Sequence, residues 1–130
     1  MARSVFKETF FLLILFSSQF AVAEQLVREF TGTRSSETLQ FEVKGPWLLD
    51  WWVGTDYPGQ MGMDISLIAA GTGAFQGEVL KTKWPGNGVR LFQESGKFQF
   101  KVISHLGNWK LKVKQLTRQE AQQYTPKVRK

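Results

Sequence analysis

Few side chains in this 130-residue sequence could do covalent chemistry, and they form no known catalytic motif. His105 is the only histidine, and no Gly-x-Ser-x-Gly motif supplies the serine of a Ser-His-Asp triad. The absence of cysteine excludes thiol catalysis, thiolate metal sites and thiol redox switching. The sequence therefore predicts that His105 is a solvated loop residue.

The acidic residues do not indicate an active site either. A glycosidase needs two carboxylates on either side of a cleft, and the only clustered acids are Asp50, Asp56 and Asp64. We expect Asp50 and Asp64 to project from the solvent faces of strands. The segment Gly71-Thr72-Gly73 is rich in glycine, but no helix follows it to complete a phosphate-binding loop. The sequence thus predicts no enzyme, no cofactor and no metal site.

Apolar and polar residues alternate along most of the chain, with the period of a β-strand. Turn residues such as Gly45-Pro46 and Ser95-Gly96 separate the alternating runs at intervals of roughly ten residues. The predicted strands cover residues 25–30, 38–43, 47–53, 61–69, 76–83, 88–93, 97–103 and 109–116. This pattern predicts an all-β fold, an antiparallel β-sandwich (jelly-roll or immunoglobulin-like) of about eight strands, with a small β-barrel as the alternative.

The strand at 47–53 indicates which side chains form the core. If Asp50 faced inward, its carboxylate would be buried without a partner, at a cost of several kcal/mol. We therefore expect Trp47 and Trp51 to face inward and Trp52 to face outward as a candidate contact residue, because Trp is common at binding hot spots. Leu39, Phe41 and Val43 are expected on the core side of their strand. The other expected core residues are Phe98, Phe100, Trp109 and Leu111.

Two aromatic motifs are predicted to form hairpins. Residues 41–51 read Phe-x-Val-x-Gly-Pro-Trp-x-Leu-x-Trp, with a tight turn at Gly45-Pro46. Residues 96–113 contain Gly-x-Phe-x-Phe-x-Val and Trp-x-Leu-x-Val, joined by a loop at 104–108. The two segments resemble those of small exported bacterial β-sandwich domains of uncharacterised role. The resemblance covers about a third of residues 24–130; it implies the fold and export, but neither catalytic residues nor a ligand.

The two ends of the chain have their own signals. Arg3 and Lys7 precede an apolar run too short to span a bilayer, and Ala21-Val22-Ala23 fits the signal peptidase site. Residues 1–23 are thus predicted to be a cleaved signal peptide of a bacterial periplasmic or secreted protein, with a retained anchor as the alternative. Residues 24–116 would form the sandwich. Residues 117–130 would form a short helix, starting at the capping box Thr117–Glu120 and ending before Pro126, and a basic tail. Its expected anchors are Leu116 and Tyr124.

Loop order predicts a candidate ligand-binding end. In an antiparallel array, alternate loops lie at the same end, so loops 31–37, 54–60, 84–87 and 104–108 should share one. This end would gather Arg34, Asp56, Tyr57, Trp84 and His105, together with Asn87 and Asn108. Aromatic rings beside polar groups can stack on and hydrogen-bond a sugar ring or a peptide.

The charge is uneven along the chain. Residues 97–130 contain nine Lys and Arg and one acid, whereas residues 24–95 contain six Lys and Arg and nine acids. If the two C-terminal strands form a hairpin, its outer face presents Lys97, Lys101, Lys110, Lys112 and Lys114. Like charges facing each other across strands repel, so this stripe could serve to bind anionic lipid headgroups or an acidic glycan. The alternative is that the lysines only discourage aggregation at a sheet edge.

These features predict a non-catalytic exported binding or adaptor domain that recognises another cell-envelope component, which could be a protein, a glycan or an anionic lipid surface. A structural subunit of a larger envelope or extracellular assembly is the alternative. A hydrolase using Asp56 and His105 is a third hypothesis. An exported protein has little access to nucleic acid, so we expect no nucleic-acid partner. After signal cleavage we expect no membrane-spanning segment.

Overall fold

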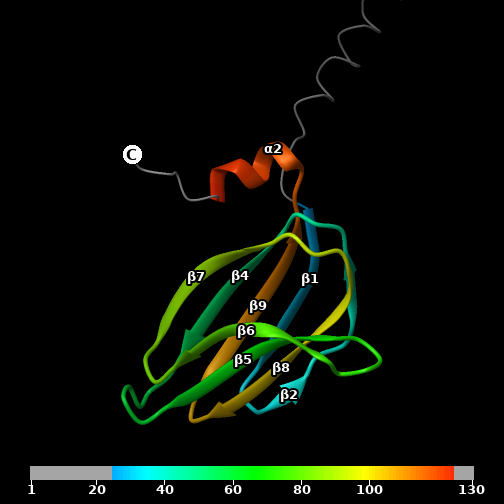
Figure 1. The fold of residues 1–130 in the computed structure, drawn as a ribbon. Coiled ribbons are helices and arrows are strands. Elements are labelled where there is room, and N and C mark those ends of the chain that lie inside the picture. Colours follow the sequence, from blue (N-terminus) through cyan, green and yellow to red (C-terminus); the bar gives the residue numbers. More distant parts are fainter. Residues whose placement is uncertain (1–24, 125–130) are drawn as a thin grey trace, which may run out of the picture.

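The computed structural model describes residues 25–124, which form an antiparallel β-sandwich with a short helical segment at its C-terminal end (Figure 1). The predicted signal peptide and residues 125–130 of the basic tail lie outside the described residues. The strands are β1 (Gln25–Gly32), β2 (Ser36–Glu37), β3 (Phe41–Val43), β4 (Trp47–Gly54), β5 (Gly62–Ala69), β6 (Phe75–Thr82), β7 (Gly86–Phe92), β8 (Gly96–His105) and β9 (Asn108–Gln115). They are followed by helix α2 (Arg118–Ala121) and the 3-10 turn η1 (Gln122–Tyr124).

The strand order is that of a jelly roll. Sheet A has the order β1-β9-β4-β7, and sheet B has the order β2-β8-β5-β6, with β3 also paired to β8. When β2 and β3 are counted as one interrupted strand, the first strand pairs with the last, the second with the seventh, the third with the sixth, and the fourth with the fifth. This nested pairing defines the jelly roll. It decides between the two predicted sandwich topologies, and the two separate sheets show that the alternative of a closed barrel is wrong.

The core lies between the two sheets, where the inward-facing side chains of both sheets interdigitate. The predicted core residues Phe41, Trp47, Phe98, Phe100, Trp109 and Leu111 are all buried. The Trp47 ring stacks on Phe92, with centroids 4.3 Å apart, and its indole N–H donates to the carbonyl of Glu94 at 2.8 Å. Trp51 faces inward as predicted but is only partly buried, since it packs at the margin of the core over Gly88 in β7. Trp52 faces outward, as predicted.

The predicted strand at 38–43 is interrupted, and one expected core residue is exposed. Leu39 was expected inward with Phe41 and Val43, but 69% of its surface is accessible. Thr38 is buried in its place and pairs with Phe100 of β8 through its side-chain hydroxyl as well as its backbone. The break between β2 and β3 changes which side of the chain faces the core, so the alternation that begins at Phe41 does not extend back to Leu39.

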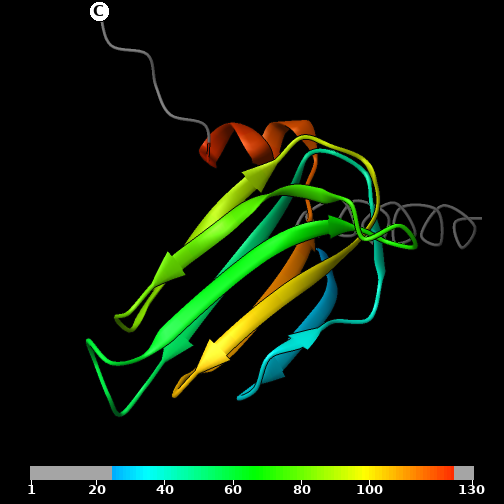
Figure 2. The same cartoon turned by 60° about the horizontal axis from the view of Figure 1, so that its bottom comes forward.

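The two predicted hairpins are wrong, although both turns exist. The chain reverses after β3 at Gly45-Pro46, a cis peptide bond, but β3 belongs to sheet B and β4 to sheet A. The turn after His105 likewise carries the chain from β8 in sheet B to β9 in sheet A. In both cases the aromatic residues on either side of the turn face each other across the core instead of along one sheet. The turns therefore connect the two layers that Figure 2 shows.

The C-terminal segment packs back onto the sandwich. Thr117 and Glu120 form the predicted capping box: the Thr117 hydroxyl accepts from the Glu120 N–H, and the Glu120 carboxylate accepts from the Thr117 N–H. Leu116 and Ala121 pack on Leu48 of β4, with Tyr124 beside them. This packing explains how a helix of one turn is stable. Within residues 25–124, no helix is long and apolar enough to cross a membrane.

Candidate functional site

The loops that were predicted to share one end of the sandwich do so. Because all pairings are antiparallel, the connections after β1, β4, β6 and β8 lie at the end opposite to helix α2 (Figures 1 and 2). Hydrogen bonds tie these loops together: the Gly59 N–H donates to the Lys83 carbonyl at 2.9 Å, and the Thr55 hydroxyl to the Leu106 carbonyl at 2.6 Å. The Trp109 indole N–H donates to the Arg34 carbonyl at 3.0 Å. Hydrogen bonds therefore connect the loops at this end to one another and to β9.

A groove of about 560 Å³ opens on the outer face of sheet B at this end. Its floor is Gly62 at the start of β5, where the absence of a side chain leaves a hollow between neighbouring strands. A Cβ atom built at Gly62 would meet only the Cβ of His105, at 3.9 Å. The other residues that line the groove are Met63, Asp64, Lys81, Thr82, Lys83, Trp84, Ile103 and His105.

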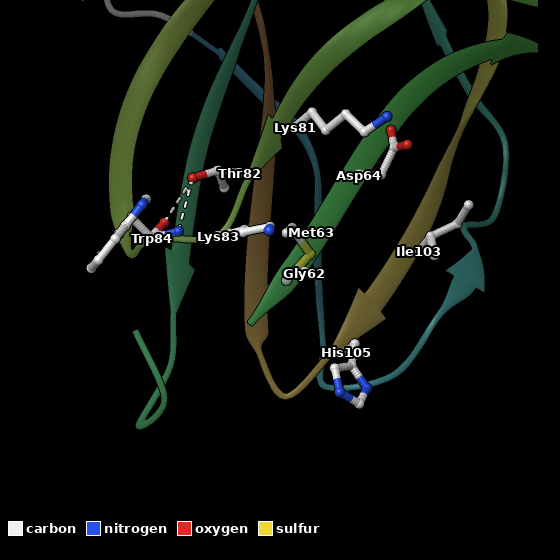
Figure 3. Close-up of a pocket in the computed structure, with 9 residues that line it drawn as sticks. All are labelled: Gly62, Met63, Asp64, Lys81, Thr82, Lys83, Trp84, Ile103 and His105. Carbon is white, nitrogen blue, oxygen red and sulfur yellow. Dashed lines mark hydrogen bonds between the residues drawn. The ribbon is translucent and has the colours of Figure 1, made fainter. Parts of the chain in front are cut away.

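Strand register explains how the two sides of the groove face each other. Gly62 lies opposite His105 of β8, and Asp64 lies between Ile103 of β8 and Lys81 of β6. In Figure 3, Lys83 and Trp84 lie on one side of Gly62, and Ile103 and His105 on the other. The groove thus combines apolar surface with ammonium groups and one carboxylate. Part of the apolar surface comes from Ile103, which is 52% exposed.

Trp84 has a defined place although it lies in a loop and is 61% exposed. The Thr82 hydroxyl accepts from the Trp84 N–H at 3.0 Å and donates to the Trp84 carbonyl at 3.1 Å. In the neighbouring loop between β4 and β5, Gly59 leaves room for the indole ring of Trp84. A Cβ atom at Gly59 would lie 3.3 Å from this ring. The hydrogen bonds fix the backbone of Trp84, and its ring packs beside Gly59 while most of the residue stays exposed.

The structure brings together only part of the predicted ligand set. Trp84 and His105 line the groove. Arg34, Asp56 and Tyr57 are exposed at the same end but are not among the groove residues. Whether they contact a ligand remains a prediction, as it does for Asn108. Asn87 lies opposite Trp52 in sheet A, away from the groove. A hydrolase would need Asp56 and His105 at one site, and the groove contains only His105.

Sequence reasoning missed Gly62, Asp64, Lys81, Lys83 and Ile103. The sequence contained a signal for Ile103 alone. Since Phe98, Phe100 and Val102 face inward, Ile103 must face outward, and an apolar side chain at an outward position can mark a contact surface.

The five lysines do not form one stripe, because β8 and β9 are not a hairpin. Lys97 and Lys101 lie on the outer face of sheet B, whereas Lys110, Lys112 and Lys114 lie on the outer face of sheet A. The lysines of β8 and β9 therefore do not face each other, so the predicted repulsion between them is absent. A single anionic surface on one face could contact only one of the two groups. Binding of such a surface stays a prediction.

Acidic residues on neighbouring strands lie opposite most of these lysines. Lys97 faces Glu42 and Lys101 faces Glu37. Lys112 lies between Glu29 and Asp50, and the Lys114 Nζ lies 3.5 Å from an Asp50 carboxylate oxygen. Opposite charges across strands stabilise a sheet.

Within residues 25–124, no group of three or more His, Asp or Glu side chains is arranged to hold a metal ion.

Comparison with known proteins does not assign the chain to a family. No protein-family model matches the sequence, and no curated protein is significantly similar to it. Among solved structures, a carbohydrate-binding module of lichenase 5A from Cellvibrio mixtus, determined in complex with cellotriose, is similar at 13% sequence identity and a TM-score of 0.37. The match covers 71% of this chain and 87% of the other. A similarity this low does not indicate what this chain binds.

Proposed function

We propose that this protein is a non-catalytic, exported binding domain that recognises another component of the bacterial cell envelope in the groove above Gly62. The observation that carries the proposal is the groove itself: a hollow of about 560 Å³, with a glycine floor, at the end where the sandwich loops are bonded together. Its size is within the usual range of ligand sites.

The lining favours a polypeptide segment in which an apolar side chain lies next to a carboxylate. Trp84 and Ile103 offer apolar surface to the apolar side chain. Lys81 lies opposite Asp64 in the strand register, and Figure 3 shows it reaching toward that residue, which leaves Lys83 as the ammonium group for the carboxylate. A charged hydrogen bond of this kind is stronger than a neutral one.

The test is to fill the groove without disturbing the fold. The Gly62→Trp variant would place an indole in the hollow, and the backbone at Gly62 does not have the positive φ that only glycine adopts readily. The control is Glu42→Trp, which adds the same ring to an exposed outer position of β3 in the same sheet. Both variants should melt close to the wild type.

Each immobilised protein is then exposed to envelope extract, with and without protease treatment of the extract, and the captured material is identified. We expect one partner that binds the wild type and Glu42→Trp but not Gly62→Trp, and that is lost after protease treatment. Equal capture by all three proteins would show that the groove is not the site. Capture that survives protease would favour a glycan, and no capture at all would contradict the proposal.

The alternative of an assembly subunit built through sheet edges or the C-terminal segment stays a second hypothesis, with two features against it. Arg90 of β7 donates to the carbonyls of Glu78 and Val79 on the edge strand β6. The helix α2 packs on Leu48 of its own sheet. These features occupy part of one sheet edge and the C-terminal segment, whereas the edges at β1, β2 and β7 have no further strand partner within residues 25–124.

A further inference from the structure

The outer face of sheet A has an aromatic side chain in a position that the fold does not require. Trp52 of β4 is 45% exposed, and its ring lies along its own strand over Gly54. A Cβ at Gly54 would be 2.4 Å from the ring, so only a glycine lets the indole lie against the strand here. The ring is thus held against its own strand, and nearly half of the residue is exposed.

The helix leaves this region uncovered. Across sheet A, Leu48 and Leu91 face the C-terminal segment, with Leu116 and Ala121 packed on Leu48. Two outward positions further along β4, Trp52 lies between Asn87 of β7 and Lys110 of β9. A hollow of about 260 Å³ lies beside the ring, lined by Asp50, Trp52, Lys110 and Lys112.

The two lysines of this hollow differ in their surroundings. Lys112 lies between two acids, Glu29 of β1 and Asp50 of β4. Lys110 lies between Thr31 of β1 and Trp52. The row that contains the exposed indole therefore carries a positive charge with no acid directly opposite, while the neighbouring row has two acids and one lysine.

We propose that Trp52 and Lys110 form a second binding site, for a carboxylated sugar such as a uronic acid unit of an acidic glycan. A half-exposed indole can stack on the C–H face of a pyranose ring, because it offers a large apolar surface that is held against Gly54. The Lys110 ammonium binds the sugar carboxylate, and Asn87 and Asp50 offer hydrogen-bonding groups to its hydroxyls. The site is on the sheet opposite to the Gly62 groove, so it does not depend on the proposed function.

The experiment uses an oligogalacturonate as the charged probe and its methyl ester as the matched neutral probe. Binding is measured by calorimetry and by the indole N–H resonance of Trp52, which is assigned by its loss in Trp52→Ala. We expect the resonance to shift with the charged probe, and we expect the ester to bind at least several-fold more weakly. Trp52→Ala should lower the affinity roughly tenfold and leave the melting temperature close to that of the wild type, since the side chain is exposed.

Two pairs of variants separate the site from its surroundings. Lys110→Gln should weaken binding several-fold, whereas Lys101→Gln should change it little, because Lys101 lies on the outer face of sheet B, away from the site. Gly54→Ala should also weaken binding, since the new Cβ displaces a Trp52 ring that is still present, whereas Trp84→Ala in the other groove should have no effect.

The proposal is overturned if the charged probe does not move the Trp52 resonance at millimolar concentration, or if ester and acid bind equally. It is also overturned if Trp84→Ala abolishes binding and Trp52→Ala does not, a result that would place the sugar in the Gly62 groove instead.

Discussion

Thr38 holds the strand β8, which carries one wall of the Gly62 groove, across a break in its partner strand. Among residues 25–124 it is the one buried polar side chain. Its hydroxyl accepts from the Phe100 N–H at 3.0 Å and donates to the Leu39 carbonyl at 3.0 Å, while its backbone N–H donates to the Phe100 carbonyl at 2.9 Å. The side chain therefore supplies the hydrogen bond that a continuous strand would have supplied. The substitution Thr38→Val removes this bond and keeps the shape of the side chain.

The loss in the free energy of unfolding follows from the amide group that valine leaves without a hydrogen-bond acceptor. The Phe100 N–H would have no acceptor next to a fully buried side chain, which costs about 1–3 kcal/mol. The methyl group that replaces the hydroxyl returns up to about 0.8 kcal/mol by apolar burial. We expect a net loss of about 1–2 kcal/mol, which for a domain of this size lowers Tm by roughly 4–16 °C.

The assay combines thermal melting with amide hydrogen exchange, and Thr38→Ser is the control. Serine keeps the hydroxyl but loses a methyl group, so it also lowers Tm. The two variants differ at the Phe100 amide, which should lose protection relative to the Val102 amide in Thr38→Val and keep it in Thr38→Ser. If Thr38→Val melts at or above the wild type with the Phe100 amide still protected, the hydroxyl does not have the role assigned to it.

Four further substitutions test the core, the turn at Gly45 and the cap of helix α2. Trp109→Ala should destabilise the domain by about 3–5 kcal/mol, and Trp51→Ala by less, because Trp109 is buried and Trp51 is only partly so; the reverse order in denaturant titrations would contradict the core described above. Gly45→Ala should sharply reduce the yield of folded protein, since its Cβ would lie 1.7 Å from the Gln93 carbonyl oxygen, and a normal melting curve would disprove this. Thr117→Ala should cost about 1 kcal/mol by removing the cap of helix α2, measured as a lower Tm; an unchanged Tm would mean that the helix adds little stability.

The sequence was informative where structure depends on neighbouring residues. The alternation of Met61, Met63, Ile65 and Leu67 predicted a strand with one buried face, and all four are buried. The capping box at Thr117 was predicted because its partners lie within one turn of each other. The placement of loops at one end was also predicted, because it depends only on the number of reversals along the chain.

Strand pairing could not be read from the same local signals. A two-residue turn at Leu106-Gly107 between alternating segments is typical of a hairpin, but it serves equally well to cross from one sheet to the other. The choice depends on which partners the strands find elsewhere: β8 pairs with β5 and β9 with β4, at sequence separations of several tens of residues. The groove was missed for the same reason, since Gly62, Lys81 and Ile103 come together only through pairings between distant segments.

The jelly-roll topology also explains the uneven charge along the chain. The basic strand β9 lies between β1 and β4, and the basic strand β8 lies between β5 and the pair β2 and β3, all from the more acidic first part of the chain. The position of each basic strand between more acidic strands places lysines opposite acids. Lys112 lies between Glu29 and Asp50, and Lys101 lies opposite Glu37. A slip by one residue would turn these charges toward the core, so the pattern helps to fix the register of the central strands. A lysine without an opposing acid, such as Lys110 beside Trp52, is then an exception to a charge pattern that the fold itself accounts for, and for this reason we assign it to binding.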